Sequence, residues 1–256
     1  MAEPYKFTVT SRTIKSTWRF YSRLKKRFET LNLGTIDQVT SVFGAVKEYT
    51  PLYGGRLFRP KHSLSYRLVD RIARHGINMS LTLSNHHFSE EKYKLTIPIL
   101  ERLYRKGNSI IATNDDLARR IRTDFPLYEI KASVSKRISS LDEIHRNLEL
   151  YDYVVLLPVM NDKIEFLQSI DCKERVILFA AVRCLYNCNS GNCFEAISDL
   201  MAEEADTSRL FCKFKDNPEM KKLKIFDLKD ERFNGFNYFK ISAFIRENNN
   251  FSGVGS

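Results

Sequence analysis

Val176-Ile-Leu-Phe-Ala-Ala-Val182 is an apolar run that leads directly into a loop holding three cysteines. A short, continuous and partly β-branched run is typical of a strand buried on both faces, and such strands belong to parallel sheets. Two further runs of this kind lie upstream, at 109–113 and 153–157. The three runs together predict a parallel sheet covered by helices.

Strand and helix patterns alternate along the rest of the chain. Counting from residue 36 gives eight candidate strands, at 36–42, 77–83, 109–113, 128–134, 153–157, 176–182, 223–227 and 236–241. Candidate helices lie between them at 62–75, 89–106, 115–123, 140–149, 161–170 and 194–204. Eight units in about 220 residues fit an α/β fold of the (β/α)8 TIM-barrel-like type, and a doubly wound open sheet is the alternative. No Gly-x-Gly-x-x-Gly or P-loop pattern follows any of these strands, so the common nucleotide-binding motifs are not indicated.

The N-terminal segment is strongly basic. After a short apolar start at 7–10, residues 11–31 read as a helix, because Trp18, Tyr21, Leu24 and Phe28 recur at spacings of three and four. The sequence therefore predicts a single barrel domain over 1–247 with an extra basic N-terminal helix. The tail at 248–256 is expected to be disordered.

The charge of the chain favours anionic partners. Its 256 residues carry a net charge of +10, and a basic excess of this kind favours RNA or DNA. We expect RNA to bind through the basic N-terminal helix, and the alternative is that this helix simply presents a solvated face. The sequence holds no apolar run near the roughly 20 residues that span a bilayer, and it does not begin with a signal-peptide pattern. A cytoplasmic protein without a membrane partner is expected.

Polar residues recur where the predicted strands end. In a barrel, binding residues come from the loops at the carboxyl ends of the strands. The glycines among them allow close backbone approach, and the arginine offers a fork for carboxylate or phosphate. The predicted substrate-binding mouth consists of Gly54, Gly55, Arg56, Asn85, Asn114, Ser133, Asn161 and Lys240.

These mouth residues also have structural interpretations. Asn114 and Asn161 could cap the helices that follow them, and Gly54-Gly55 could form only a turn. Lys240 could be satisfied by a salt bridge. His86 and His87 are adjacent on a strand end and point to opposite sides, which disfavours a shared metal. No general acid–base pair and no nucleophile elbow is recognisable, so the sequence assigns no catalytic residue and does not support hydrolysis by the common routes.

The cysteine loop has the spacing of a metal site. Cys184, Cys188 and Cys193 lie within ten residues, and Cys212 follows farther on. Clustered thiolates in a reducing compartment ligate zinc or an iron–sulfur cluster, with the fourth ligand coming from a distance. The spacing matches neither a zinc ribbon nor a ferredoxin run. Structural thiols, a disulfide and a redox pair are the alternatives.

Several short motifs resemble the collagenase-like peptidase family, numbered U-thirty-two among peptidases. Tyr53-Gly-Gly-Arg-Leu-Phe58 is similar to its early Tyr-x-Gly-Gly-x-x-Phe, and Gly76 to Asn85 resembles its strand ending in Thr-x-Asn. The run 176–184 with Ser190-Gly-x-Cys193 resembles its strand that enters Cys and Ser-Gly-x-Cys. Tyr238-Phe-Lys-Ile-Ser242 resembles its Phe-Lys-Ile-Glu-Gly-Arg, although Glu-Gly-Arg is replaced here.

The resemblance implies a barrel enzyme with an iron–sulfur cluster that takes part in oxygen-independent hydroxylation of RNA bases or of a small aromatic substrate. It matches Cys184 and Cys193 by context, while Cys188 is additional and the family's second cysteine pair is not recognisable. We expect Cys184, Cys188, Cys193 and Cys212 to hold the cluster, with zinc as the alternative. The alternative function is a catalytically silent barrel that binds nucleic acid or protein, with zinc or free thiols in the loop.

Overall fold

Eight parallel strands close into a barrel. The computed structural model describes residues 4–11, 20–54, 63–186, 188, 193–201 and 218–243. The barrel strands are β1 (Lys6–Thr10), β2 (Val39–Gly44), β3 (Asn78–Leu83), β4 (Ser109–Ala112), β5 (Glu129–Ala132), β6 (Tyr153–Val155), β7 (Val176–Val182) and β9 (Tyr238–Ile241). Each pairs in parallel with its neighbours in the order β1 to β7 and then β9, and β9 pairs with β1 to close the ring. The (β/α)8 barrel predicted from the sequence is confirmed.

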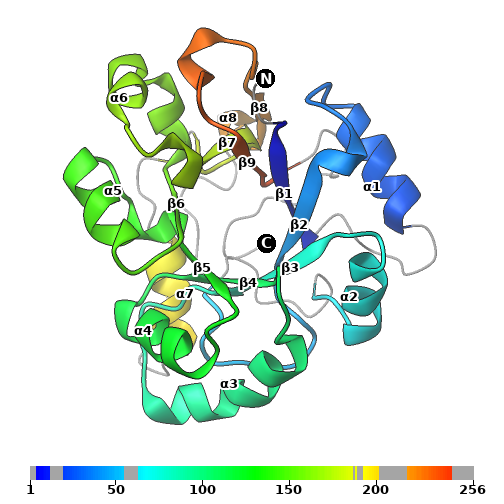
Figure 1. Cartoon of the computed structure of the whole chain (residues 1–256), viewed down its shortest axis with the longest axis vertical. Helices are drawn as coiled ribbons and strands as arrows, with labels where there is room; N and C mark the ends of the chain where they lie inside the picture. Colours follow the sequence, from blue (N-terminus) through cyan, green and yellow to red (C-terminus); the bar gives the residue numbers. More distant parts are fainter. Residues whose placement is uncertain are drawn as a thin grey trace.

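Six helices surround this ring, one after each of the first six strands (Figure 1). They are α1 (Phe20–Glu29), α2 (Tyr66–Ala73), α3 (Glu90–Leu103), α4 (Asp115–Asp124), α5 (Leu141–Leu148) and α6 (Ile164–Ser169). Short 3-10 helices lie at η2 (Ile36–Gln38), η4 (Val134–Lys136), η5 (Pro158–Asp162), η6 (Lys173–Arg175) and η8 (Glu231–Phe233). Within the described ranges, no helix combines the length and apolar character that crossing a bilayer requires.

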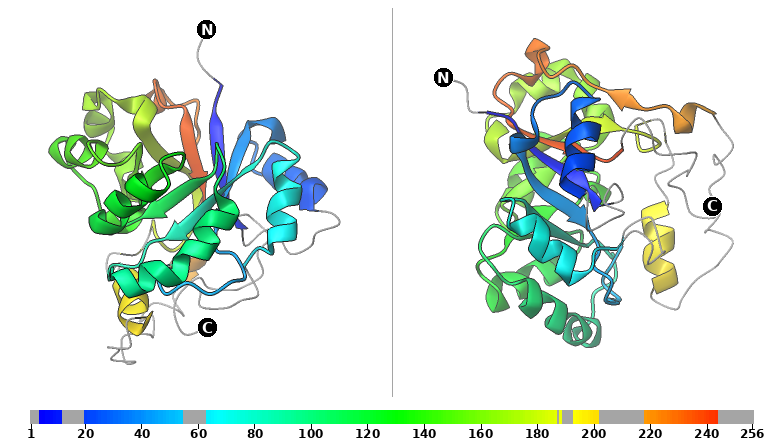
Figure 2. Two further views of the ribbon diagram at one scale, coloured as in Figure 1. Left: turned by 60° about the horizontal axis from the view of Figure 1, so that its bottom comes forward. Right: turned by 90° about the vertical axis from the view of Figure 1, so that its right-hand side faces the viewer.

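The segment after β7 departs from this pattern. It holds α7 (Cys193–Met201), α8 (Pro218–Lys221) and the two-residue strand β8 (Lys224–Ile225). β8 pairs with the end of β7 in the antiparallel direction. Figure 2 shows α7 set apart from the ring, on the side opposite the N-terminus. The carboxyl ends of the barrel strands open on that same side.

Two elements differ from the sequence prediction. The first barrel strand is Lys6–Thr10, which reads in sequence only as a short apolar start. The helix predicted as an extra N-terminal element is therefore α1, the partner of β1. The strand predicted at 223–227 is not in the barrel, because only 224–225 pair and they run antiparallel. The cysteine loop consequently follows the seventh strand of the barrel, not the sixth.

The apolar core lies between the strands and the helices. All residues of β7 are buried, as its continuous apolar run predicts. On α1 the predicted apolar face is confirmed for Leu24 and Phe28, which are fully buried. The ring of Phe28 packs edge-on against Phe7 of β1, with 5.0 Å between centroids. This contact explains why β1 and α1 belong together as the first unit of the barrel.

The interior of the barrel is polar, in contrast to its outer core. Hydroxyl groups of Ser41, Ser80 and Ser109 hydrogen-bond in sequence across β2, β3 and β4, at 3.3 and 2.7 Å. Lys131 of β5 donates to the hydroxyl of Tyr238 of β9 at 2.7 Å. Because β5 and β9 are not neighbours in the sheet, this bond crosses the inside of the barrel.

Candidate substrate-binding mouth and cysteine loop

The cysteine loop begins at the carboxyl end of β7. Cys184 is buried, Cys188 and Cys193 are half-buried, and all three carry thiols. Cys193 is the first residue of α7. Three thiols close in sequence, at the end of the barrel where ligands bind, have the donor chemistry of a zinc or iron–sulfur site. As described in the structure, however, these three thiols do not form a group whose ligand atoms all lie within 4.8 Å of one another. Among the residues expected at the site, Cys212, Gly55 and Arg56 lie outside the described residues.

Two of the predicted mouth residues use their amides within the fold. Asn85 is buried, and it donates to the carbonyl of Pro51 and accepts from the backbone N–H of His87. Asn114 accepts from two backbone N–H groups in the first turn of α4, at 2.9 and 3.0 Å. Its amide nitrogen donates to the carbonyl of His86 at 3.1 Å. The capping role that the sequence leaves open for Asn114 is confirmed.

Ser133 and Asn161 are also tied to neighbouring elements. The hydroxyl oxygen of Ser133 accepts from both the backbone N–H and the hydroxyl of Ser135. The amide nitrogen of Asn161 donates to the carbonyl of Phe179 in β7 at 2.7 Å. Asn161 therefore anchors η5 to β7 and does not cap α6, whose N-cap is Lys163. Its buried Oδ1 has no hydrogen-bond partner among the described residues.

Gly54 makes the close backbone approach that its sequence context suggests. A Cβ atom at this position would lie 2.2 Å from the carbonyl carbon and oxygen of Ser84, and 2.3 Å from the nitrogen of Asn85. The loop after β2 thus lies directly on the end of β3. The packing of these two loops explains why a glycine occupies position 54. It also places the side-chain amide of Asn85 within hydrogen-bond distance of the Pro51 carbonyl.

Lys240 lies on the inner side of β9 and is 6% exposed. Its ammonium group stands 4.0 Å from the ring centroid of Phe43, a half-buried residue near the end of β2. Because β1 lies between these two strands, the contact bridges the mouth side of the interior. A cation over an aromatic face is a favourable way to hold a lysine in a partly dry site.

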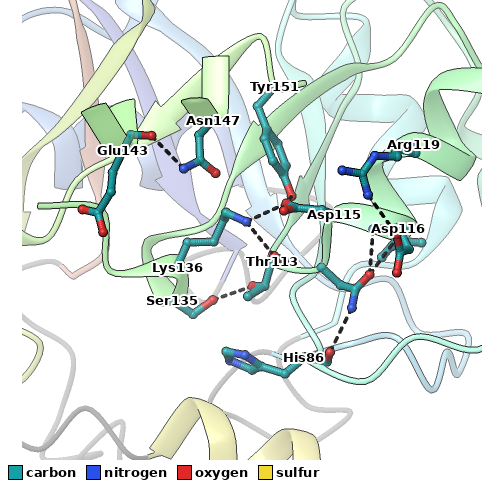
Figure 3. Close-up of polar contacts among 12 residues, drawn as sticks. His86, Thr113, Asp115, Asp116, Arg119, Ser135, Lys136, Glu143, Asn147 and Tyr151 are labelled. Carbon is teal, nitrogen blue, oxygen red and sulfur yellow. Dashed lines mark hydrogen bonds and ion pairs between the residues drawn. The ribbon is translucent and has the colours of Figure 1, made fainter. Parts of the chain in front are cut away.

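An ion pair organises the corner of the mouth after β4 and β5. The ammonium of Lys136 donates to a carboxylate oxygen of Asp115 at 2.6 Å and to the carbonyl of Thr113 at 3.2 Å. The hydroxyl of Tyr151 donates to the same carboxylate oxygen at 2.7 Å (Figure 3). Burial alone would raise the pKa of Asp115, but the hydrogen bonds from Lys136 and Tyr151 lower it below its ordinary value. Asp115 is thereby held as a carboxylate.

A chain of hydroxyl groups and one imidazole lie beside this pair. The hydroxyls of Thr113 and Ser135 are 2.5 Å apart, and Ser135 donates to Ser133. His86 projects from the end of β3 below these hydroxyls in Figure 3. Its Nε2 is buried and has no hydrogen-bond partner among the described residues. Burial lowers the pKa of His86, so the neutral imidazole is favoured.

Helix α7 covers this corner. The backbone N–H of His86 donates to the hydroxyl of Ser198 at 3.1 Å, and His87 Nε2 lies 2.9 Å from an oxygen of Asp199. Arg137 pairs with Glu195 at 3.3 Å. His86 and His87 lie in the loop after β3, so the strand alternation expected for them does not apply, and their imidazoles have different surroundings. The helix that begins at Cys193 is thus fastened to the loops after β3 and β5.

This corner has the parts of an acid–base site. A neutral imidazole can accept a proton, and an ammonium held by Asp115 can stabilise a developing negative charge. Sequence reasoning places Ser135, Lys136 and the histidines at strand ends, but it does not connect them. The sequence signal that could connect them is their place in the chain, because each lies within a few residues of the end of β3 or β5.

A closed ring of eight parallel strands with helices on its outside defines a TIM-barrel protein. The fold is similar to the structure titled "The Structure of the U32 Peptidase Mk0906", with a TM-score of 0.59, 95% of this chain and 94% of that chain covered, and 12% sequence identity. No family model matches the sequence, and no curated protein matches it. This structural similarity confirms the barrel fold that the resemblance to the collagenase-like peptidase family implies. At 12% identity it concerns the fold alone.

Proposed function

We propose that this barrel is a divergent relative of the collagenase-like peptidase family that modifies an RNA base or a small aromatic substrate, by chemistry of the oxygen-independent hydroxylation type. One observation carries the proposal: the cysteine loop leaves β7 at the same end of the barrel as the polar corner around His86 and Lys136. Because barrels bind their substrates at this end, the cluster ligands and the substrate would share one mouth.

The cysteines are assigned to an iron–sulfur cluster under this proposal. Cys184, Cys188 and Cys193 would hold it, with Cys212 as the fourth ligand. A bound cluster would supply one-electron transfer. The residues around it would bind and orient the substrate: Lys240 and Lys136 offer positive charge, and His86 offers a neutral base. RNA would approach through the exposed basic side chains of α1.

Anaerobic purification tests the cluster directly. The expected protein is coloured and contains iron and acid-labile sulfide, and Cys193→Ser loses most of both. Cys172→Ser is the comparison variant, because Cys172 precedes β7 at the opposite end of the barrel and is not a ligand of the proposed cluster. A colourless, iron-free wild-type protein, or equal loss of iron in the two variants, would remove the cluster from the proposal.

A catalytically silent binding module is the second candidate. It is favoured by the amides of Asn85 and Asn114 and the hydroxyl of Ser133, which are engaged in holding loops and caps. Salt-dependent retention on RNA by a metal-free protein, unchanged in Cys193→Ser, would support this module. Retention that requires the loaded cysteine loop would argue against it.

A further inference from the structure

A second group of metal-binding side chains lies at the other end of the barrel. His145 is in the last turn of α5, and Asp171 and Cys172 lie between α6 and β7. Segments that enter a strand lie at its amino end, so this group is on the face opposite the mouth. It shares no residue with the cysteine loop.

The three side chains are already close together. One ligand atom from each of His145, Asp171 and Cys172 lies within 4.8 Å of the other two. His145 Nε2 is 2.8 Å from an Asp171 oxygen, and the Cys172 thiol also hydrogen-bonds to Asp171. Ligands around tetrahedral zinc lie about 3.3–3.8 Å apart, as follows from metal–ligand bonds of about 2.0–2.3 Å. Small side-chain rotations would therefore bring the three atoms to coordination distance.

The backbone around the group is firmly held. The guanidinium of Arg175 donates to the carbonyls of Leu148, Tyr151 and Asp152, at 2.8 to 3.0 Å. The N–H of Arg175 donates to the carbonyl of Cys172 at 3.0 Å. These bonds fix the segment before β7 against the end of α5. The backbones that carry His145 and Cys172 are thus held together by Arg175, independently of the three ligand side chains.

The basic side chains next to this group, Lys173 and Arg175, are engaged with other partners. The ammonium of Lys173 donates to the carbonyl of Asn234 and lies over the ring of Phe236. Arg175 is engaged with the carbonyls named above. Asp171 has an imidazole and a thiol as its neighbours, and both are metal ligands when deprotonated.

We propose that His145, Asp171 and Cys172 bind one divalent transition-metal ion of the zinc class, with solvent completing the coordination. Imidazole and thiolate select zinc or cobalt over magnesium and calcium, which prefer oxygen ligands alone. The half-exposed position of His145 leaves the fourth site open to water. The ion links α5 to the segment before β7 and thereby stabilises the folded barrel, because a metal that binds only the folded state raises its stability.

Cobalt titration of the full-length, metal-stripped Cys193→Ser protein tests this site, because that background removes a thiol of the cysteine loop, which also carries zinc-type donors. One equivalent of Co²⁺ is expected to produce a sulfur-to-cobalt charge-transfer band at micromolar metal. The band should disappear when Cys172→Ser or His145→Gln is added to Cys193→Ser. Zn²⁺ should bleach the band and raise the Tm of Cys193→Ser, but not that of Cys193→Ser combined with His145→Gln.

Two results would overturn the site. One is a cobalt band that survives when His145→Gln is added to Cys193→Ser, which would place the metal elsewhere. The other is the absence of a band below millimolar Co²⁺ in Cys193→Ser. His145 is half-exposed, so its variant decides the question even where Cys172→Ser fails to fold. Iron content under anaerobic purification reports the loop cluster separately, so the two proposals fail independently.

Discussion

At the scale of single residues, Asn114 shows how one side chain joins two loops. It caps α4 with its oxygen and holds the carbonyl of His86 with its nitrogen. We expect Asn114→Ala to lower the free energy of unfolding by about 1–2 kcal/mol, because the helix cap and the bond to the His86 carbonyl are both lost. Asn114→Asp keeps the capping oxygen and loses only the donor, so it should cost less. Urea unfolding of the three proteins checks this order, and equal losses in both variants would contradict it.

His86 predicts a pH dependence of stability. Its pKa is lowered in the folded state by burial, so the unfolded chain takes up a proton more readily. Stability is therefore fully present above the ordinary histidine pKa of about 6.5, and it is lost as the pH falls from there toward the folded pKa. We expect the urea midpoint of His86→Gln to fall less than that of the wild type between about pH 8 and about pH 5.5. Parallel slopes would exclude His86 as the group responsible.

At the scale of elements, the sequence predicts where a helix or strand lies better than it predicts which strands belong to the barrel. Long periodic helices such as α3 and continuous strands such as β7 are found near their predicted bounds, because burial alone determines those patterns. β1 shows alternation over only five residues, so its sequence does not distinguish it from a segment outside the barrel before its partners are known. The segment 223–227 has the alternation of a strand, but its residues pair only at the edge of β7. Only the closure of the barrel shows that β1 is one of its strands and that 223–227 is not, and closure depends on the whole chain.

The attachment of α7 gives a prediction for an element. Ser198 is fully buried and accepts the backbone N–H of His86, whereas the pair between Arg137 and Glu195 is exposed. Ser198→Ala leaves the part-buried N–H of His86 without its acceptor, at a cost of about 1–3 kcal/mol. Glu195→Gln removes a surface pair worth about 0–1 kcal/mol. We expect hydrogen exchange of the α7 amides to accelerate strongly in the first variant and little in the second.

The basic face of α1 predicts a salt-dependent interaction with RNA. Arg23, Lys25 and Lys26 are exposed, while Leu24 and Phe28 are buried, so the charged side chains can be changed without disturbing the core. Replacing Arg23 and Lys26 by Gln should weaken RNA binding and reduce the salt slope by about 0.7 for each phosphate that is no longer neutralised. Lys94→Gln, on the exposed side of α3, is the matched control. A slope that changes equally in both proteins would show that RNA does not bind at α1.

At the scale of the whole molecule, the polar interior is the feature that sequence reasoning misses. Ser41, Ser80 and Ser109 occupy strand positions that look like solvent-facing residues when each strand is read alone. They meet because β2, β3 and β4 pair side by side, and the closure of the sheet turns these positions inward. The same holds for the mouth, where strand ends are predictable but the links between His86, Lys136 and α7 are not. Burial patterns are local, whereas these contacts join residues far apart in sequence.

The pair of Lys131 and Tyr238 provides the test of this interior. Lys131 is 3% exposed, and its ammonium group lies against the hydroxyls of Ser80 and Tyr238 and over the rings of Tyr153 and Tyr238. Burial would raise the pKa of Tyr238, but the ammonium 2.7 Å away reverses this and lowers it below the ordinary value. The charge of Lys131 and the hydroxyl of Tyr238 therefore stabilise each other inside the barrel.

A double-mutant cycle measures how strongly Lys131 and Tyr238 stabilise each other. Tyr238→Phe removes the closest hydrogen-bond partner of a buried ammonium and should cost about 1.5–3 kcal/mol, the range for a hydrogen bond to a charged group. Lys131→Met removes the charge together with its need for a partner, so it should cost less. In the double variant the two effects should fall short of their sum by about 0.5–3 kcal/mol, because the residues act as a pair. Additive losses in the free energy of unfolding, measured with urea, would mean that each side chain is stabilised by other neighbours. The contact across the barrel interior would then not contribute to its stability.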